Sequence, residues 1–177
     1  SAGVPTVWLG LINHALQNDL KFSTFRRTVI GGSACPPAMM DTLIDKLDVE
    51  VIHAWGMTEM SPLGTTGTLQ GKHQRLSKDE QRKILQKQGH AVFGVDMKIV
   101  DDEGKELPWD GASSGALKVR GSWVCSSYFR LDVSTAHAEP GWFATGDVAV
   151  IHPNGFLQIT DRAKDVIKSG GEWISSV

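Results

Sequence analysis

The pattern that most clearly indicates the fold lies in residues 141–175, GWFATGDVAVIHPNGFLQITDRAKDVIKSGGEWIS. Two apolar runs, residues 148–151 and 156–160, flank His-Pro-Asn-Gly, in which proline and glycine occupy favoured turn positions. This pattern predicts an antiparallel hairpin, preceded by a Thr-Gly-Asp turn that ends at Asp147. A basic, glycine-bearing run follows the hairpin from Asp161 onward.

Upstream of this stretch, the first part of the chain has the pattern of a βαβ unit. Apolar residues at helical spacing predict a helix over residues 5–20 and a second helix opened by Pro36. Apolar runs predict strands over residues 25–30 and 49–54. A strand, a helix and a strand in so short a stretch indicate a parallel sheet.

The pattern changes after Pro62. Residues 64–71 are rich in Gly and Thr and are expected to form a loop, whereas residues 77–80 form a capping box that predicts a surface helix stopped by Gly89. From Ala91 the apolar period becomes two, which predicts a separate, mainly antiparallel region. The predicted fold class is therefore α/β plus β: a βαβ part of a parallel sheet followed by a distorted antiparallel β subdomain.

Composition narrows the class of protein. The chain has 177 residues, 41% of them hydrophobic, and a net charge of −2, so it can bury a core and has no basic surface for nucleic acid. No apolar run approaches the roughly 18 residues of a membrane span, and the start lacks the pattern of a signal peptide. We expect a cytoplasmic protein with reduced Cys35 and Cys125 and without a structural zinc site.

Both ends of the chain stop in mid-pattern. The opening Ser1-Ala2 resembles a cut inside a longer chain, and the segment from Trp173 to Val177 carries no capping or tail signal. We therefore expect an excised piece of a longer protein.

The turn Gly31-Gly32-Ser33-Ala34 is the first candidate for binding chemistry. It joins a predicted strand to a predicted helix, where free backbone N–H groups allow a ligand to approach closely. The same Gly-Gly pair also fits an ordinary turn, so the motif alone does not decide between the two.

A second candidate, Trp55-Gly56-Met57-Thr58-Glu59, follows the second predicted strand. Ligands of open α/β sheets lie beyond the carboxyl ends of the strands. There Thr58 could donate a hydrogen bond to a phosphate oxygen, Glu59 could hold Mg²⁺, and Trp55 offers a flat face for a base. A capped turn with a solvated Glu59 and a core Trp55 explains the same spacing.

The third group lies around the hairpin. Asp147 could accept two hydrogen bonds from a ribose diol, and Arg162 has rigid paired donors for phosphate or ribose oxygens. Lys168 suits a negatively charged intermediate. An acidic turn residue and a solvated, charge-alternating loop are the alternatives at these positions.

The order of four motifs, GGSACP, HAWGMTEMSP, GWFATGD and DRAKDVIKSGGEWIS, resembles the adenylate-forming (AMP-binding) superfamily. Within it, the chain is most similar to medium- and long-chain fatty acyl-CoA ligases. The resemblance implies an enzyme that forms an acyl adenylate from a carboxylic acid and Mg·ATP and then transfers the acyl group to coenzyme A. The implied cofactors and small-molecule partners are ATP/AMP, Mg²⁺, coenzyme A and a fatty acid, without nucleic acid.

The resemblance also implies which residues carry each role. Thr58, Glu59 and Lys168 would be catalytic, with Glu59 as the Mg²⁺ ligand. The implied nucleotide-binding residues are Gly32, Ser33, Ala34, Trp55, Gly56, Thr58, Asp147 and Arg162.

The C-terminal residues would serve the second half-reaction. Lys164 matches a hinge before a mobile C-terminal domain, in a superfamily that often has Asp there. The implied coenzyme A side consists of Gly170, Gly171, Glu172 and Trp173.

The resemblance implies three parts. Residues 1–75 would be the α/β part of the AMP-binding N-terminal domain, residues 76–162 a helix and a β-barrel-like subdomain, and residues 163–177 the hinge and the start of the lid. The superfamily's phosphate loop and remote C-terminal lysine have no counterpart here, so we expect the isolated chain to be inactive.

Two other interpretations stay open. The chain could belong to an enzyme that adenylates an aryl or amino acid and passes it to a carrier protein. It could also be a non-catalytic binding or scaffold piece in which the motifs are structural.

Overall fold

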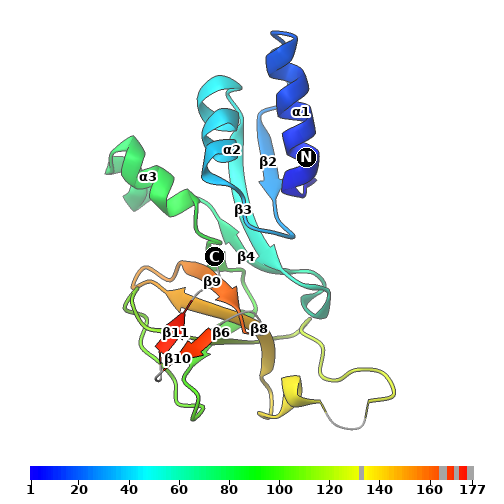
Figure 1. Cartoon of the computed structure of the whole chain (residues 1–177), viewed down its shortest axis with the longest axis vertical. Coiled ribbons are helices and arrows are strands. Elements are labelled where there is room, and N and C mark those ends of the chain that lie inside the picture. The colour runs from blue at the N-terminus through cyan, green and yellow to red at the C-terminus, as the bar shows by residue number, and fades with distance from the viewer. Residues whose placement is uncertain (132–133, 164–166, 170–171, 175–177) are drawn as a thin grey trace.

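The computed structural model describes residues 1–131 and 134–163 with their side chains, and the backbone of residues 167–169 and 172–174. Two sheets follow one another along the chain, and the longer helices accompany the first of them (Figure 1). The predicted α/β plus β class is confirmed by this arrangement.

The first sheet has five strands in the order β1-β2-β3-β4-β5. The first three run parallel, as the βαβ pattern predicts, whereas β4 and β5 add antiparallel pairs. The first sheet therefore includes β5, which lies beyond residue 75, the predicted end of the α/β part. Its strands are β1 (Ala2–Gly3), β2 (Arg27–Ile30), β3 (Glu50–Gly56), β4 (Leu63–Gly67) and β5 (His90–Ala91).

The loop predicted over residues 64–71 is wrong for its first half, which forms β4. Threonine suits an extended, half-buried strand, and β4 is hydrogen-bonded on both sides, to β3 and to β5. The fully buried Thr65 hydroxyl donates to the Gln88 carbonyl oxygen at 2.6 Å. Pairing with two neighbours thus outweighs the flexibility of the flanking glycines.

Two helical segments build the first core. Helix α1 (Pro5–Gln17) begins at a proline, and α2 (Pro37–Asp41) continues as a π-helical turn, η1 (Thr42–Lys46). Their apolar faces pack with the sheet into one cluster, so burial of these faces stabilises the βαβ unit. Its buried members are Trp8, Ile12, Ala15, Ile30, Cys35, Met39, Met40, Leu43, Leu47, Val49 and Val51.

Helix α3 (Lys78–Leu85) begins at the predicted capping box. The Glu80 N–H donates to Ser77 Oγ at 3.3 Å, and the Ser77 N–H donates to Glu80 Oε2 at 2.9 Å. The helix has no buried residue, which confirms the predicted surface helix. It is preceded by a short 3₁₀ turn, η3 (Gly71–Arg75).

The predicted stop at Gly89 is wrong, because α3 already ends at Leu85. Gly89 has a φ of +92°, and a Cβ there would lie 2.0 Å from the Thr66 carbonyl oxygen. Glycine is therefore required for a close approach to β4, not for ending the helix.

The second sheet is an antiparallel meander in the order β6-β7-β8-β9. The predicted hairpin is confirmed: β8 and β9 pair across the turn at residues 152–156. The strands are β6 (Val95–Val100), β7 (Ser114–Gly121), β8 (Phe143–Ile151) and β9 (Leu157–Arg162). Their buried core is Met60, Val95, Met97, Ile99, Leu117, Val119, Phe143, Ala149, Ile151 and Leu157.

The Thr-Gly-Asp motif lies inside β8 and is not the turn before a strand that the sequence predicts. β8 begins at Phe143 because its first residues pair with β7, beyond a register shift between Ala116 and Lys118. A second shift, between Val148 and Ala149, accompanies the pairing with β9. These irregularities leave Asp147 directly opposite Arg162.

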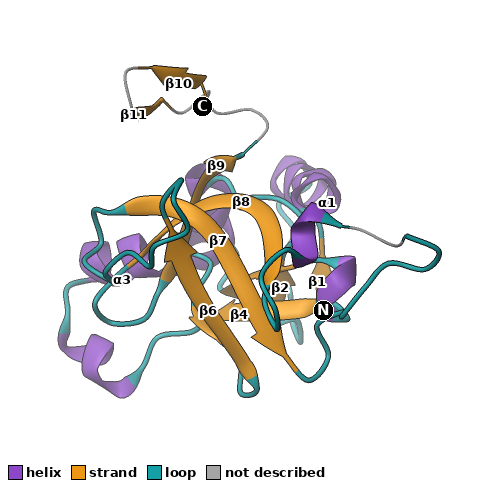
Figure 2. Ribbon diagram, turned by 90° about the horizontal axis from the view of Figure 1, so that it is seen from below, coloured by secondary structure: helices purple, strands orange, loops and turns teal. Residues whose placement is uncertain are grey.

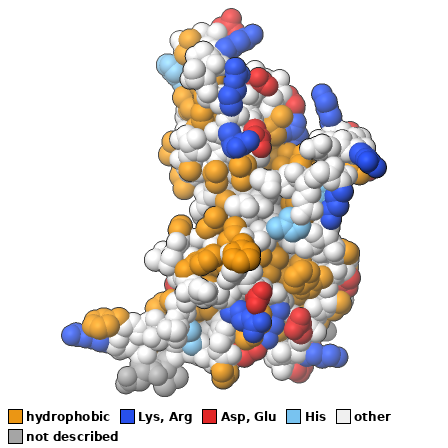
Figure 3. Space-filling view, turned by 180° about the vertical axis from the view of Figure 1, so that it is seen from behind, with side chains coloured by type: hydrophobic (Ala, Val, Ile, Leu, Met, Phe, Trp, Pro, Cys, Tyr) orange, Lys and Arg blue, Asp and Glu red, His pale blue; other side chains and the backbone are white. Residues whose placement is uncertain are grey.

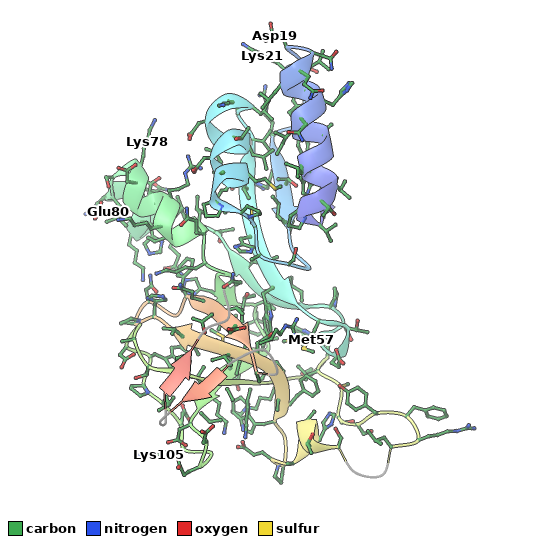
Figure 4. All side chains as sticks on the ribbon, in the orientation of Figure 1. Asp19, Lys21, Met57, Lys78, Glu80 and Lys105 are labelled. Carbon is green, nitrogen blue, oxygen red and sulfur yellow. The ribbon has the colours of Figure 1, made fainter. Side chains whose placement is uncertain are left out.

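The two sheets are tied together at one junction. The Gln88 N–H donates to the Leu157 carbonyl oxygen at 3.0 Å, and the Leu157 N–H donates to the Gly89 carbonyl oxygen at 2.8 Å. Met60, on the short turn η2 (Thr58–Met60) after β3, is buried in the core of the second sheet. Met57 lies at the same junction, where β3 and β4 meet the lower part of the molecule (Figure 4).

The chain ends in a small ladder of β10 (Ile167–Ser169) and β11 (Glu172–Ile174), beyond the end of β9 (Figure 2). A further 3₁₀ turn, η4 (Thr135–His137), precedes β8. On the face that is turned away from the viewer in Figure 1, hydrophobic side chains gather across the middle of the molecule (Figure 3).

Candidate functional site

A cavity of about 270 Å³ opens at the junction of the two sheets. It contains seven of the eight residues that the sequence predicts for nucleotide binding, and Thr58 is the eighth, outside it. The structure thus brings the motif residues together, whereas their roles stay predictions. The lining residues are Gly32, Ser33, Ala34, His53, Ala54, Trp55, Gly56, Gln88, Asp147, Ile159 and Arg162.

The turn after β2 forms one wall of the cavity. Gly32 has a φ of +82°, a conformation that side chains rarely adopt, and a Cβ there would lie 3.0 Å from Val4 Cγ1. Ser33 and Ala34 line the same cavity beyond the carboxyl end of the parallel strand β2, where α/β sheets bind ligands.

Asp147 is the central charge of the cavity and is only 2% exposed. The Trp55 indole Nε1–H donates to its Oδ2 at 3.0 Å, and Arg162 Nε lies 2.9 Å from its Oδ1. Burial raises the pKa of the Asp147 carboxyl, while Arg162 and the Trp55 N–H oppose that shift. Among the described residues, each carboxylate oxygen thus has one side-chain partner and retains acceptor capacity for a ligand hydroxyl.

The backbone holds Asp147 in this position. Its N–H donates to Thr145 Oγ1 at 3.1 Å, and the Thr145 hydroxyl donates to the Leu117 carbonyl oxygen at 3.1 Å. Because β8 and β9 pair in the observed register, Arg162 is held beside the carboxylate. The carboxylate is therefore preorganised, with its charge balanced by a half-exposed guanidinium.

His53 is buried with both ring nitrogens bonded. The Cys35 N–H donates to Nε2 at 3.3 Å, so Nδ1 carries the proton and donates to the Gln86 carbonyl oxygen at 3.0 Å. Burial lowers the pKa of His53. The ring is thus a neutral bridge that supports the cavity wall, as expected for a packing residue.

A second cavity, of about 230 Å³, adjoins the first and contains Met57 and Thr58. It shares Gly32, Ala54, Trp55 and Gly56 with the first cavity, so Thr58 lies next to the predicted nucleotide site. Thr58 is exposed, and its predicted contact with a phosphate stays a prediction.

Glu59 is held by a residue that the sequence interpretation missed. The Tyr128 phenol donates to Glu59 Oε1 at 2.9 Å, and the Cys125 N–H donates to the Glu59 carbonyl oxygen at 2.8 Å. Burial and this hydrogen bond raise the pKa of Tyr128 to about 12. No local motif connects positions 59 and 128, so only the tertiary structure could reveal the contact.

The residues around Glu59 fit a magnesium–nucleotide site better than an all-protein metal site. Within the described residues, no three His, Cys, Asp or Glu side chains gather as metal ligands. Mg²⁺ is commonly held by one or two carboxylates together with substrate phosphates and water. A single carboxylate with one oxygen bonded to Tyr128 fits that pattern.

The predicted lid residues are only partly described. Lys164, Gly170 and Gly171 lie outside the described residues. Lys168 lies on β10 opposite Trp173 on β11, and Ser169 lies opposite Glu172. Their assignment to a hinge and to the coenzyme A side stays a prediction.

The site has the composition expected of an enzyme that handles nucleotides, and comparison with known proteins identifies the family. The family model described as AMP-binding enzyme matches residues 1–129, so the chain belongs to the AMP-binding enzymes. The predicted superfamily is therefore confirmed. In the part of the chain that the structure describes, no helix is long and apolar enough to cross a membrane.

Two relatives and one solved structure define the similarity further. The 3-methylmercaptopropionyl-CoA ligase of Ruegeria lacuscaerulensis is 54% identical over 99% of this chain and 32% of its own length. The medium-chain-fatty-acid–CoA ligase of Ectopseudomonas oleovorans is 52% identical over the same shares of 99% and 32%. The O-succinylbenzoate coenzyme A synthetase from Bacillus subtilis, in complex with ATP and magnesium ion, has a TM-score of 0.76 at 26% identity, covering 98% of this chain and 33% of that one.

The chain spans about a third of the length of these three proteins. The predicted similarity to fatty acyl-CoA ligases is confirmed, because both relatives named above are acyl-CoA ligases. What the whole protein acts on is a separate question.

Proposed function

We propose that this chain is the central part of an acyl-CoA ligase that activates a fatty acid with ATP and transfers the acyl group to coenzyme A. The observation that carries the proposal is the cavity at the sheet junction, where residues from four separate motif positions meet around the buried Asp147 carboxylate. The similarity to two acyl-CoA ligases over 99% of the chain supports it. An enzyme that consumes ATP and coenzyme A fits a cytoplasmic location.

The cavity would hold the nucleoside of ATP. The Trp55 ring would offer a flat face for the base, in the same cavity that the Gly32 turn lines. Asp147, with one partner on each oxygen, would accept hydrogen bonds from the ribose hydroxyls. The guanidinium of Arg162 stands beside it for ribose or phosphate oxygens.

Adenylation would take place at the neighbouring end of β3. A carboxylate attacks the α-phosphate of ATP, an acyl–phosphate bond forms and pyrophosphate leaves, so the protein mainly positions groups and neutralises charge. Thr58 would donate to an α-phosphate oxygen, and Glu59 would hold Mg²⁺, which neutralises the phosphates when bound. Such chemistry requires no general base of the Ser-His-Asp kind.

Thioester formation would use the end of the chain. The coenzyme A thiol attacks the acyl carbonyl and AMP leaves, with Lys168 placed for the negatively charged intermediate. Lys164 would be the hinge that lets the Gly170–Trp173 segment reach the site. These assignments rest on the sequence.

The test is acid-dependent pyrophosphate exchange by the full-length enzyme. We expect exchange with fatty acids, and thioester formation when coenzyme A is added, whereas the isolated 177 residues should show no turnover. A series of acids of different length, alongside aryl and amino acids, identifies the substrate class. Exchange only with aryl or amino acids, or transfer only to a carrier protein, would overturn the fatty-acid assignment. Absence of exchange with every acid would overturn the proposal that the full-length protein is an adenylate-forming enzyme.

A further inference from the structure

Gln88 is a buried polar residue of the cavity to which neither the motifs nor the proposed mechanism assigns a role. It lies between α3 and β5, is only 7% exposed and lines the cavity with Trp55 and Asp147. Polar side chains that are buried to this degree normally have hydrogen-bond partners for all their polar atoms.

Most polar atoms of Gln88 do have partners. Its backbone N–H donates to the Leu157 carbonyl oxygen at 3.0 Å, and its carbonyl oxygen accepts the Thr65 hydroxyl at 2.6 Å. The side-chain Oε1 accepts the Ile159 N–H at 2.7 Å. Three hydrogen bonds from two strands, β4 and β9, thus hold the residue. The Ile159 N–H assigns the carboxamide oxygen, since only an acceptor can face that donor.

The amide nitrogen is the exception. Nε2 carries two N–H donors, and no hydrogen bond joins it to another described residue, whereas it is not among the fully enclosed unpaired atoms of the described chain, so it is open to the cavity that Gln88 lines. Because the carboxamide is planar and its oxygen is bound to β9, the nitrogen is held in a single direction. A donor that is fixed in direction and open to a cavity is available to a ligand acceptor.

The chemistry of the cavity indicates the part of the ligand that Gln88 meets. Asp147 and Arg162 supply the charges suited to ribose and phosphate, whereas Trp55 supplies a flat aromatic face. Ile159 adds an apolar surface beside Gln88. A neutral donor among aromatic and apolar groups suits the edge of a heterocyclic base, and the ring nitrogens of a purine are acceptors of the matching kind.

We propose that Gln88 is a base-recognition residue whose Nε2 donates a hydrogen bond to a ring nitrogen of the adenine of ATP. The inference rests on the proposed function, because it assigns the nucleoside to this cavity. Gln88 would select among nucleotides at the base edge, while Asp147 and Arg162 bind groups common to all ribonucleotides.

Gln88→Glu in the full-length enzyme tests the donor. Glutamate keeps an oxygen for the Ile159 N–H and the shape of the side chain, but it replaces both amide donors with an acceptor. We expect the dissociation constant for ATP, measured by calorimetry without acid, to rise about 10-fold or more. Gln158→Glu is the matched control: Gln158 is exposed on β9, away from the cavity lining, and the same change should leave ATP affinity within about 2-fold.

Base analogues test the same contact in the unmodified enzyme, so the answer does not depend on a variant that could misfold. The 1-deaza, 3-deaza and 7-deaza forms of ATP each lack one ring nitrogen. We expect the wild-type enzyme to bind one of them about 10-fold more weakly than ATP, and the Gln88→Glu variant to lose no further affinity for that analogue. The inference would be overturned if the wild-type enzyme bound all three analogues as tightly as it binds ATP. It would also be overturned if a folded Gln88→Glu variant bound ATP with unchanged affinity. Failure of the wild-type enzyme to bind ATP at all would instead refute the proposed function together with the inference.

Discussion

Trp55 and Asp147, 92 residues apart in the chain, are joined by one hydrogen bond: the indole N–H of Trp55 donates to Asp147 Oδ2 at 3.0 Å. The bond connects β3 of the first sheet to β8 of the second, and each residue lies close to a register shift, between Trp55 and Gly56 in β3 and between Val148 and Ala149 in β8. It therefore holds the flat face and the buried charge of the cavity in one arrangement, and disturbing either residue should affect both folding and nucleotide binding.

Trp55→Phe removes the indole N–H but keeps an aromatic ring at the end of β3. The lost donor leaves a buried carboxylate with one partner fewer, which typically costs about 1.5–3 kcal/mol in the free energy of unfolding. Urea denaturation measures the change. Trp109→Phe, at an exposed tryptophan outside the cavity lining, is the control, and equal stability of the two variants would contradict a structural role for the Trp55–Asp147 bond.

Asp147→Asn should weaken ATP binding more than it weakens the fold. The amide cannot accept from Trp55, Arg162 and two ribose hydroxyls at once, because half of its polar atoms are donors. A loss of about 2 kcal/mol corresponds to roughly 30-fold in the dissociation constant for ATP. Asp96→Asn is the control, because it breaks the exposed Asp96–Arg120 pair and should change the affinity for ATP little. Similar ATP affinities for the two variants would show that Asp147 has no role in nucleotide binding.

Tyr128→Phe should weaken the metal site through Glu59. Without the phenol, Glu59 Oε1 loses the hydrogen bond that orients the carboxylate, and outer partners of metal ligands are typically worth about 10–100-fold in metal affinity. Titration with Mn²⁺, followed by electron paramagnetic resonance in the presence of ATP without acid, measures this affinity.

The Glu59→Gln variant provides the control for that experiment. If Tyr128 acts only through Glu59, the Tyr128→Phe change should have no effect on metal affinity once Glu59 is Gln. An equal loss with and without the Glu59 carboxylate would show that Tyr128 merely stabilises its loop.

Acid should destabilise the chain through three histidines. Burial lowers the pKa of His53, of His73 and of His90 below the ordinary value, so below about pH 6.5 the unfolded state binds more protons than the folded state. Their contribution to stability is complete above that pH and is lost as the pH falls through the lowered values. Urea midpoints between pH 8 and pH 5 measure the loss.

His53→Gln identifies the main contributor to that pH dependence. Protonating His53 would turn Nε2 into a donor facing the Cys35 N–H, so its removal should flatten the pH dependence. His14→Gln, on the exposed side of α1, should leave the slope as it is. An unchanged slope in the His53 variant would show that other groups cause the acid sensitivity.

Local patterns in the sequence determined much of the architecture and the membership of the cavity. Helical spacing, Pro5 and the Ser77–Glu80 capping box placed the helices, because these signals act over a few residues. Alternating apolar residues around the 152–156 turn placed the hairpin for the same reason. The four motifs also named seven of the residues that line the cavity, although each motif alone fitted an ordinary turn.

Contacts between distant segments were decided only by the tertiary structure. The strand β4 exists because β3 and β5 satisfy its backbone on both sides, and Gly89 serves the approach to β4 and not the end of α3. The hydrogen bond from Tyr128 to Glu59 and the hydrogen bond from the Ile159 N–H that orients the Gln88 amide likewise depend on segments far apart in the chain. Periodicity and turn chemistry record each residue's neighbours along the chain, whereas burial and the pairing of polar groups depend on which segments meet when the sheets pack.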